Sequence, residues 1–274
     1  MKNGDLAMFH IAANLPETEK KCLNIAMVYN PDEEIGSIYS KEITDRIGCQ
    51  ADHIFVMESA GKNGTRHCFA RKGSLTYDIE FQGQAAHAGF MFEVENASAV
   101  LEMGHYIVEL MNLADREKDT TVNVGVANGG TARNVVADHA KISVEMRFWD
   151  DSERIRLKEY VNKITKGQPF VPGVKTTIAM QKETPPFIKT EEAKKYIERV
   201  RKVAEEQGIP FEEKDRGGLS DANHLSRCGN AIVMDGMGPH GANDHSEKEY
   251  GYIGSVEPCV KLHLAILNDM LNKQ

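Results

Sequence analysis

The sequence lacks the features that mark secreted, membrane-spanning and nucleic-acid-binding proteins. No window approaches the ~20 apolar residues that a transmembrane helix needs, and residues 1–16 contain no continuous apolar segment of the signal-peptide kind. We find no internal repeat and no low-complexity segment. Lys and Arg are mixed into the acidic stretches and the formal net charge is −8, so no basic face for nucleic acid is indicated.

The cysteines form no recognisable framework. They are five, an odd number, scattered and without a Cys-x-x-Cys pair: Cys22, Cys49, Cys68, Cys228 and Cys259. This usage is typical of a reducing compartment, and it argues against disulfide scaffolds and cysteine zinc sites. We therefore expect a soluble cytoplasmic protein. Its 274 residues, 41% of them hydrophobic, suffice for one large domain or two smaller ones.

The first part of the chain has the pattern of an α/β domain. Apolar spacing predicts a helix, a buried strand, a second helix and a second strand, over residues 6–12, 22–28, 37–47 and 53–57. Ser37 is a possible N-cap of the second helix, and Glu58 ends the second strand. Buried strands in the order strand, helix, strand imply a parallel pair in an α/β layer.

The pattern changes near residue 72, where alternation with period two predicts a half-exposed antiparallel strand. The elements expected from here on are a strand at 76–81, a helix at 96–114, strands at 121–126 and 140–148, a helix at 152–165 and a strand at 174–180. This β-α-β-β-α-β order is that of a ferredoxin-like domain.

The last part returns to the α/β pattern. It predicts a helix from Glu191, strands at 211–214 and 231–234, and a closing helix at 256–271. We therefore expect an α/β domain made of residues 1–71 and 182–274, interrupted by a ferredoxin-like domain at residues 72–181.

Carboxylates gather where the predicted strands of the α/β domain end. Asp32, Glu33 and Glu34 follow the strand at 22–28, and Glu58 follows the strand at 53–57. Ligands of open α/β sheets collect at this edge. One glutamate there can hold a cation while its neighbour takes a proton from water. The simpler alternative, that Asp32 and Glu33 only complement the dipole of the helix near Ser37, has about equal weight on this segment alone.

A glycine-rich loop, GMGPHGANDHSE, follows the strand at 231–234 and brings His245 to the same edge. Imidazole together with carboxylates is an ordinary set of zinc ligands. A loop histidine taken alone is more often a surface residue. In this setting we favour a ligand role for His245 and treat His240 as a bystander.

The inserted domain carries two further candidates. His87 stands among small residues in GQAAHAG, where a simple tight turn is the alternative interpretation. Arg147 follows GGTARNVV and can hold an anionic group as a planar bidentate donor, although an exposed arginine beside a hairpin explains it almost as well.

Together these segments resemble the zinc aminoacylase and carboxypeptidase family, which includes acetylornithine deacetylase, succinyl-diaminopimelate desuccinylase and the folate-cleaving glutamate carboxypeptidases. The similarity is greatest to the last group and spans the chain in family order: MKNG, PDEEIGS, DHIFVMES, GQAAHAG, GGTARNVV, EMRF, GGLSDANHLS and GPHGANDHSEKEY. The resemblance implies a zinc-binding α/β domain interrupted by a ferredoxin-like lid through which two subunits form a homodimer.

The resemblance also implies roles for individual residues. Glu33 would be the general base of amide hydrolysis. The zinc ligands would be Glu34, Glu58 and His245. His87 would stabilise the oxyanion in the partner subunit's site, and Asn134 and Arg147 would hold the terminal carboxylate of the substrate.

The sequence departs from the family pattern in two places. The upstream His-x-Asp motif and the aspartate that bridges two metals are not found, so the sequence is expected to be truncated relative to the family. Without these ligands we expect the chain to bind zinc poorly and to have little activity. A non-catalytic dimeric binding or regulatory module is the rival interpretation. Thr184 stands where glutamate-cleaving members have a second arginine, which leaves small peptides and N-acyl amino acids open as substrates.

Overall fold

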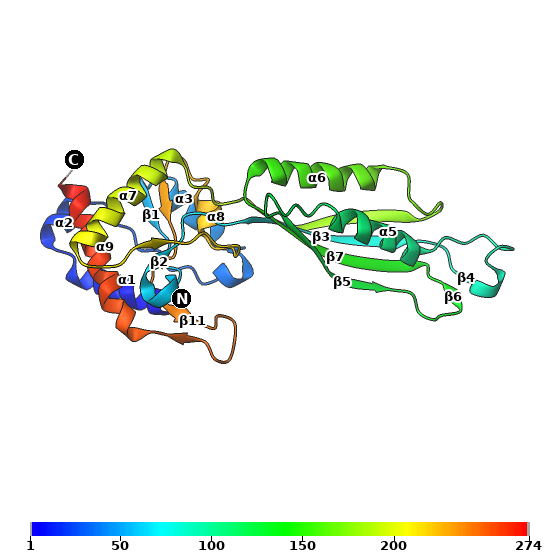
Figure 1. Ribbon diagram of the computed structural model, residues 1–274, viewed down its shortest axis with the longest axis horizontal. Helices are drawn as coiled ribbons and strands as arrows, with labels where there is room; N and C mark the ends of the chain where they lie inside the picture. Colours follow the sequence, from blue (N-terminus) through cyan, green and yellow to red (C-terminus); the bar gives the residue numbers. More distant parts are fainter. Residues whose placement is uncertain (1, 273–274) are drawn as a thin grey trace. The chain divides into compact units, whose positions relative to one another are not determined.

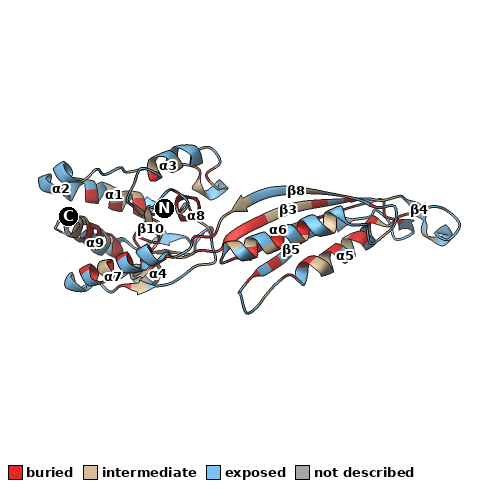
Figure 2. Ribbon diagram, turned by 90° about the horizontal axis from the view of Figure 1, so that it is seen from above, coloured by how far each residue is buried: buried red, intermediate tan, exposed pale blue. Residues whose placement is uncertain are grey.

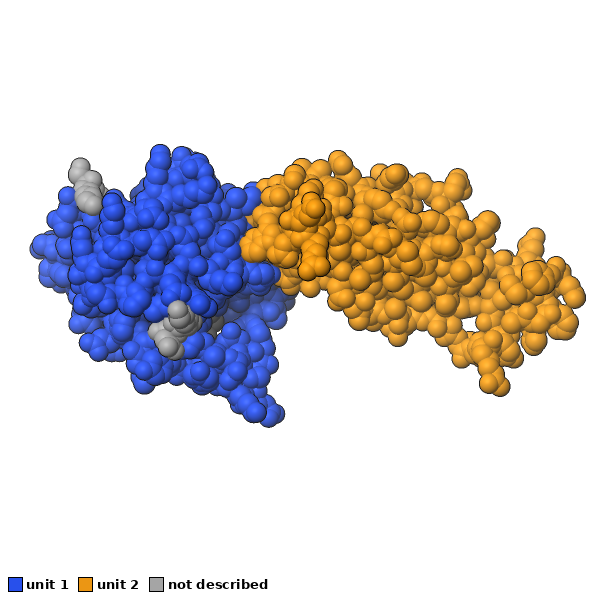
Figure 3. All heavy atoms as spheres, viewed as in Figure 1, with its two compact units in different colours: residues 1–71, 187–274 blue, residues 72–186 orange. Residues whose placement is uncertain are grey.

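A computed structural model describes residues 2–272 as two compact units (Figure 3). Unit 1 combines the residues up to Arg71 with those from Phe187 onward, and unit 2 comprises Lys72–Pro186. The expected end of the inserted domain, residue 181, falls inside the last strand of unit 2, which continues to Thr184.

Unit 2 is a four-stranded antiparallel sheet covered on one face by two helices (Figures 1 and 2). Its main elements in chain order are β3 (Gly73–Gln82), α5 (Ala99–Met111), β5 (Thr121–Gly129), β7 (His139–Phe148), α6 (Asp151–Lys166) and β8 (Lys175–Thr184). The strands lie in the order β5-β7-β3-β8. This is the ferredoxin-like β-α-β-β-α-β arrangement, so the fold predicted for the insertion is confirmed.

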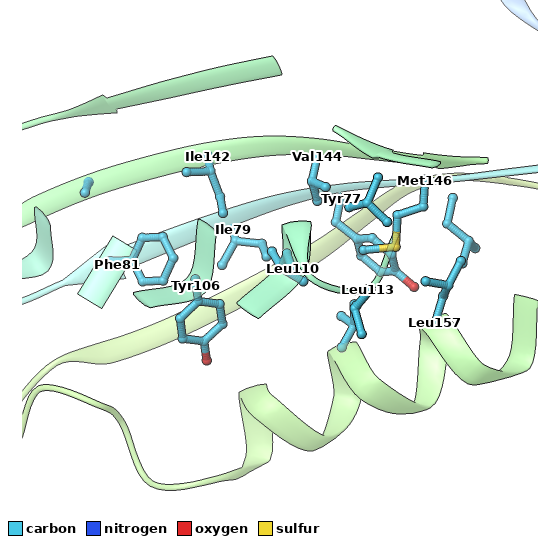
Figure 4. Close-up of a cluster of buried hydrophobic side chains, with 14 of the residues drawn as sticks. Tyr77, Ile79, Phe81, Tyr106, Leu110, Leu113, Ile142, Val144, Met146 and Leu157 are labelled. Atoms are coloured by element: carbon cyan, nitrogen blue, oxygen red, sulfur yellow. The ribbon is translucent and has the colours of Figure 1, made fainter. Parts of the chain in front are cut away.

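The alternation seen in the sequence places every second side chain of β3 and β7 on the covered face. The core between sheet and helices, shown in Figure 4, is formed by residues from both layers: Ile79, Phe81, Ile142, Val144 and Met146 from the strands, with Tyr106, Leu110 and Leu157 from α5 and α6. Ser98 and Asp150 cap the two helices, because their side-chain oxygens accept backbone N–H groups of Leu101 and Glu153.

Two short strands lie beyond this sheet, where β7 begins. They are β4 (Ala86–His87) and β6 (Val135–Val136), which pair with each other, and the 3₁₀ helix η2 (Ala88–Phe90) follows β4. They position the GQAAHAG and GGTARNVV segments side by side.

Unit 1 contains the remaining elements. Its helices are α1 (Lys2–Asn14), α2 (Glu17–Cys22), η1 (Glu33–Ile35), α3 (Lys41–Gly48), α4 (Gly61–Gly64), α7 (Glu191–Glu206), α8 (Ala222–Leu225), η3 (Ile253–Ser255) and α9 (Val256–Leu271). Its strands are β1 (His53–Phe55), β2 (Arg66–His67), β9 (Glu212–Glu213), β10 (Ile232–Met234), β11 (Gly241–Ala242) and β12 (Tyr250–Gly251). β1 pairs with β10 and β2 with β9, both in parallel. Apolar faces of α1, α7 and α9 bury one common core around Met234.

The predicted buried strand at residues 22–28 is wrong. The structure assigns no strand there, and Ile25 and Val28 are both more than a third exposed. No strand among the described residues pairs with this segment, so its apolar side chains have no sheet to bury them. The parallel partner of β1 is β10, on the other side of the insertion in sequence.

The predicted N-cap role of Ser37 is also wrong. Ser37 has a φ of 56° and lies in the turn before α3, which begins only at Lys41. Ser37 is buried, and its hydroxyl donates a hydrogen bond to Asp221, which directly precedes α8.

Among the described residues 2–272, no helix is long and apolar enough to cross a membrane.

Candidate active site

The PDEEIGS segment forms a tight turn that fixes its acidic residues. Gly36, with φ 89°, donates its N–H to the carbonyl of Glu33 at 2.7 Å, and Ser37 donates to the carbonyl of Asp32 at 2.8 Å. The Asp32 carboxylate accepts the N–H of Tyr39 at 2.7 Å and of Ser40 at 3.3 Å. Hydrogen bonding, first from the Ser40 side chain and then from Tyr39, lowers the pKa of Asp32. The Asp32 carboxylate therefore holds the turn that leads into α3.

Glu33 lies in a field of negative charge. Burial, and then the nearby charges of Glu58, Asp221 and Glu34, raise the pKa of Glu33 to about 7. Burial also raises the pKa of Glu58, and the carboxylates of Asp235 and Glu34 add to this. The structure thus brings Glu33, Glu34 and Glu58 into one acidic neighbourhood.

His245 approaches the same neighbourhood. Its Nδ1 lies 3.7 Å from an Oε2 of Glu34, and both side chains are mainly exposed. Glu and His supply the donor atoms that zinc takes. Within residues 2–272, however, no group of three or more His, Cys, Asp or Glu side chains is arranged to hold a metal ion. The donor types are present, but in this arrangement they do not fit a closed metal site.

A hydrogen-bonded network that we did not predict holds the PDEEIGS turn against the loop before α8. Asp221 accepts hydrogen bonds from Ser37 Oγ and Asn30 Nδ2, each at 2.5 Å. His224 bonds Asp221 through Nε2 at 3.0 Å and Asp45 through Nδ1 at 2.5 Å. This network links the turn to α3 and α8. Its signal in the sequence was the GGLSDANHLS segment, in which Asp221 and His224 are spaced i, i+3.

Burial by itself raises the pKa of Asp221, but hydrogen bonds from His224, Ser37 and Asn30 outweigh it and lower that pKa. Asp221 is therefore an anion held in place rather than a group that exchanges protons. Its charge acts on Glu33, and the network sets where that charge lies.

A buried ion pair between Arg71 and Asp235 anchors the same segment from the other side. Arg71 also donates to the carbonyls of Gly218 and Leu219 at 3.1 and 3.3 Å. Ser220 Oγ donates to Asp235 at 2.6 Å. Because both charges are paired and hydrogen-bonded, the network is a rigid support for the loop that carries Asp221.

His240 is a structural residue. Its Nδ1 lies 3.2 Å from the Ala60 carbonyl, and its backbone N–H donates to Ser255 Oγ at 2.8 Å. Nothing in these contacts places its ring with the acidic residues, in line with the bystander role we expect.

His87 lies in unit 2 with an exposed ring whose tautomer is fixed. The N–H of Gly89 donates to His87 Nδ1 at 3.1 Å, so in the neutral ring the proton is on Nε2. The ring also packs on Phe90, with centroids 5.2 Å apart. The geometry leaves Nε2–H as a hydrogen-bond donor, which is what an oxyanion-stabilising residue needs.

Asn134 lies beside His87 but far from Arg147. The carbonyl of Asn134 accepts the N–H of Ala88 at 2.9 Å. Arg147 lies near the other end of β7 and pairs with Glu145 at 2.6 Å. The eight residue-to-residue steps from His139 to Arg147 extend about 27 Å at ~3.4 Å per step. One copy of unit 2 therefore does not bring Asn134 and Arg147 to a common carboxylate.

Comparison with known proteins agrees with this architecture. A family profile described as a peptidase dimerisation domain matches residues 69–169. Carboxypeptidase G2 of Pseudomonas sp. strain RS-16 is 22% identical over 272 residues, which are 98% of this chain and 65% of that protein. Acetylornithine deacetylase of Myxococcus xanthus is 29% identical over 149 residues, covering 50% of this chain and 37% of that protein. These matches support the resemblance of the chain to the aminoacylase and carboxypeptidase family.

The fold of the chain also matches a solved structure over nearly its whole length. The aminopeptidase PepT of Bacillus cereus ATCC 10987 superimposes with a TM-score of 0.78 at 22% identity, over 98% of this chain and 70% of that one. This likeness shows a shared fold, whereas the family resemblance is supported by the profile and sequence matches. The chain spans about two thirds of the length of Carboxypeptidase G2.

Proposed function

We propose that the chain is part of a metal-dependent hydrolase that cleaves amide bonds in small peptides or N-acyl amino acids, of the carboxypeptidase or deacylase type. The observation that carries this proposal is the acidic neighbourhood of Glu33, Glu34 and Glu58, which His245 joins at 3.7 Å from Glu34. Relatives described as a carboxypeptidase and a deacetylase support the reaction class.

In this proposal Glu33 is the general base. A base works best when its pKa lies near the working pH, because it then accepts a proton and later releases it to the leaving amine. Glu33 has this property, since burial and three neighbouring carboxylates raise its pKa to about 7. Glu34, more exposed and on the same turn, faces His245 instead. Adjacent glutamates thus have separate roles.

Substrate groups would be held by residues of unit 2. His87 presents Nε2–H to a developing oxyanion, and Asn134 lies beside it. Since Arg147 lies at the far end of β7, we propose that Arg147 and the pair of His87 and Asn134 act on one substrate only when they come from different copies of the chain. This is the arrangement that a homodimer with shared sites requires.

The family is generally metal-dependent. We propose zinc as the metal, bound by Glu34, Glu58 and His245 together with donors that these three do not supply. A zinc site needs about four ligands, and the described residues contain no assembled group of three. The 274-residue chain by itself should therefore bind zinc weakly and hydrolyse slowly.

Calorimetric titration with zinc chloride, combined with a hydrolysis assay, tests this proposal. The assay panel comprises peptides with C-terminal glutamate, other dipeptides and N-acetyl amino acids. We expect weak zinc binding that Glu34→Gln removes, and slow hydrolysis that Glu33→Gln lowers by about 10²- to 10⁴-fold without changing zinc binding. His240→Gln is the matched control, since the His240 ring lies at the Ala60 carbonyl and near the rings of Tyr250 and Tyr252.

Two outcomes would contradict parts of the proposal. Tight binding of two zinc ions with fast turnover would contradict the expected weak zinc binding, but it would support the proposed hydrolase activity. Hydrolysis equal in the wild type and in Glu33→Gln would overturn the role of Glu33.

A dimeric binding or regulatory module is the rival function, favoured by the dimerisation-domain match and by the incomplete donor set. It predicts that panel compounds bind to the chain without being cleaved, with or without zinc. We further propose that the protein works in the cytoplasm, for which its five free cysteines are suited.

The proposed homodimer would form through α5 and the edge strand β5. Five large apolar side chains on these two elements are more than a third exposed: Val100, Leu101, Val108, Met111 and Val126. By contrast α6, the other helix on this face of the sheet, exposes mainly charged residues and only Ile155 among large apolar ones. A second copy packed on α5 and β5 would bury the apolar set.

A further inference from the structure

Two cysteines far apart in the sequence lie at the ends of neighbouring helices in unit 1. Cys49 follows α3 and is exposed, whereas Cys228 comes shortly after α8 and is 4% exposed. α3 and α8 pack against each other and are already joined by the bond between His224 and Asp45. The two cysteines therefore lie at the same helix junction, one exposed and one covered.

Backbone contacts place the two residues within reach of each other. The Asp45 carbonyl accepts the N–H of Cys49 at 2.8 Å and also the Sγ of Cys228 at 3.5 Å. A methyl group at Gly48 would lie 3.7 Å from Cys228 Sγ, and one at Gly229 would lie 3.9 Å from the Cys49 carbonyl oxygen. The segments 48–49 and 228–229 thus run in direct contact, and the Cys49 side chain is among the neighbours that raise the pKa of Cys228.

The exposed partner borders an open hollow. Cys49 lines it together with His53, Gly229 and Asn230, and its volume is about 540 Å³. A hollow of this size admits a small peptide-like molecule. A soluble oxidant can therefore reach Cys49, whereas Cys228 is covered.

We propose that Cys49 and Cys228 are a reversible disulfide site that is oxidised by low-molecular-weight disulfides. The Cys49 thiolate attacks one sulfur of the small disulfide, an S–S bond to Cys49 forms, and one small thiolate leaves. Cys228 then gives its proton to solvent and attacks the Cys49 sulfur, which releases the second small thiolate. The two protein thiols are oxidised to one disulfide, and one small disulfide is reduced to two thiols.

The order of the two steps follows from the surroundings of each sulfur. Burial, with the neighbouring Cys49 and Asp45 adding to it, raises the pKa of Cys228 to about 12. A thiol of this kind is a poor first nucleophile. Cys49 therefore reacts first, and Cys228 reacts once the mixed disulfide is held beside it.

The disulfide would fix α3 against α8. These helices follow the two segments that the Asp221 network joins, namely the turn with Glu33 and the loop with Asp221. Oxidation would thus tighten the support of the acidic neighbourhood. The site itself depends only on the two thiols and not on hydrolase activity.

Peptide mapping after oxidation tests the proposal. The full chain is incubated with oxidised glutathione, the remaining thiols are alkylated in denaturant, and the protein is digested with trypsin. Each cysteine falls in its own tryptic peptide, with Cys49 in residues 47–62 and Cys228 in residues 228–248. We expect these two peptides to be linked in most molecules, and the link to disappear after treatment with dithiothreitol.

Variants make the result specific. Cys49→Ser, at an exposed position, should keep the fold and abolish the link, and Cys228→Ser should leave glutathione on Cys49. Cys22→Ser, at the other exposed cysteine, is the matched control and should leave the link unchanged. If the wild type carried a stable glutathione adduct on Cys49, and Cys228 remained a free thiol that the reagent alkylates, the proposal would be overturned. A linked pair that includes Cys22 as often as Cys49 would also overturn it.

Discussion

His224 is held between two carboxylates, and this determines its charge. Both ring nitrogens lie at hydrogen-bond distance from carboxylate oxygens, Asp221 on one side and Asp45 on the other, so both must carry protons. Burial by itself lowers the pKa of His224, but the bonds to the two aspartates outweigh it and raise that pKa. Lys41 also faces Asp45, and the Cys228 thiol lies near the same carboxylate. The junction of α3 and α8 is therefore stabilised by an imidazolium.

The first residue-scale prediction concerns this charge. His224→Gln should lower the free energy of unfolding by about 1–3 kcal/mol at pH 6, because two carboxylates lose a charged donor. The folded-state pKa of His224 is raised above the unfolded value of about 6.5, so its stabilisation is complete below that value and is lost as the pH rises through the folded pKa. Urea unfolding of both proteins over a pH series measures the difference.

His10→Gln is the control for that series, since His10 is exposed on α1. The difference between wild type and His224→Gln should shrink with rising pH, whereas His10→Gln should follow the wild type throughout. A difference that stays constant across the series would show that the imidazolium is not the stabilising species.

The candidate site was predictable to the extent that chemistry is visible in single residues. Consecutive carboxylates at the end of an apolar run led to Glu33 and Glu34, and a glycine-rich loop led to His245. Asp221 and His224 were missed because their importance comes from partners 179 to 191 positions away in sequence. Hydrogen bonds over such separations leave no local pattern.

At the scale of elements, helices and strands were predicted correctly where one of their faces packs against a core. Alternation in β3 and β7 and helical spacing in α9 gave correct element types, because one side of each element faces a core. The run at 22–28 has the same apolar composition but no strand beside it, and it remains irregular. Strand formation depends on a partner, and the pattern within one segment cannot supply it.

An element-scale prediction follows from two glycines of unit 2. Gly83 lets the end of β3 cross the segment before α5, where Gln84 and Ala97 exchange backbone hydrogen bonds of 2.9 and 3.0 Å. A Cβ at Gly83 would lie 2.0 Å from the Ala97 carbonyl oxygen, and backbone cannot move aside as a side chain can. Gly83→Ala should therefore reduce the free energy of unfolding by about 1–3 kcal/mol or more.

Gly104→Ala is the matched control for this substitution. Gly104 lies within α5, and a Cβ there would have nothing within 4 Å, so the same change should stabilise by about 0.5–1 kcal/mol. Denaturant unfolding of the two variants checks both signs. If Gly83→Ala proved as stable as Gly104→Ala, the close crossing before α5 would not be a constraint on the fold.

At the scale of the whole molecule, the sequence predicted the class of fold and a family resemblance that the comparisons support. A change of hydrophobic period near residue 72 marked the insertion, and the order of its elements identified the ferredoxin-like sheet. Motif order along the chain indicated the family resemblance, and a peptidase dimerisation domain profile matches residues 69–169. The surface of assembly was not predictable, because apolar residues on α5 have the same spacing whether they face the sheet or a second copy.

The structure shows which side of α5 faces the sheet. Tyr106 and Leu110 are buried there, whereas Val108 is 59% exposed. If two copies meet along α5, a charge at Val108 must be buried in the dimer without a partner, which is costly. Val108→Glu should therefore raise the dissociation constant of the dimer at least tenfold, equivalent to about 1.4 kcal/mol. Ile155→Glu places the same charge at a 50% exposed position on α6 and should leave the constant unchanged.

Sedimentation velocity over a concentration series measures both dissociation constants, with thermal unfolding as the check that each variant is folded. Equal dimerisation of wild type and Val108→Glu would show that α5 is not the contact surface, and loss of the dimer in Ile155→Glu alone would place the surface on α6.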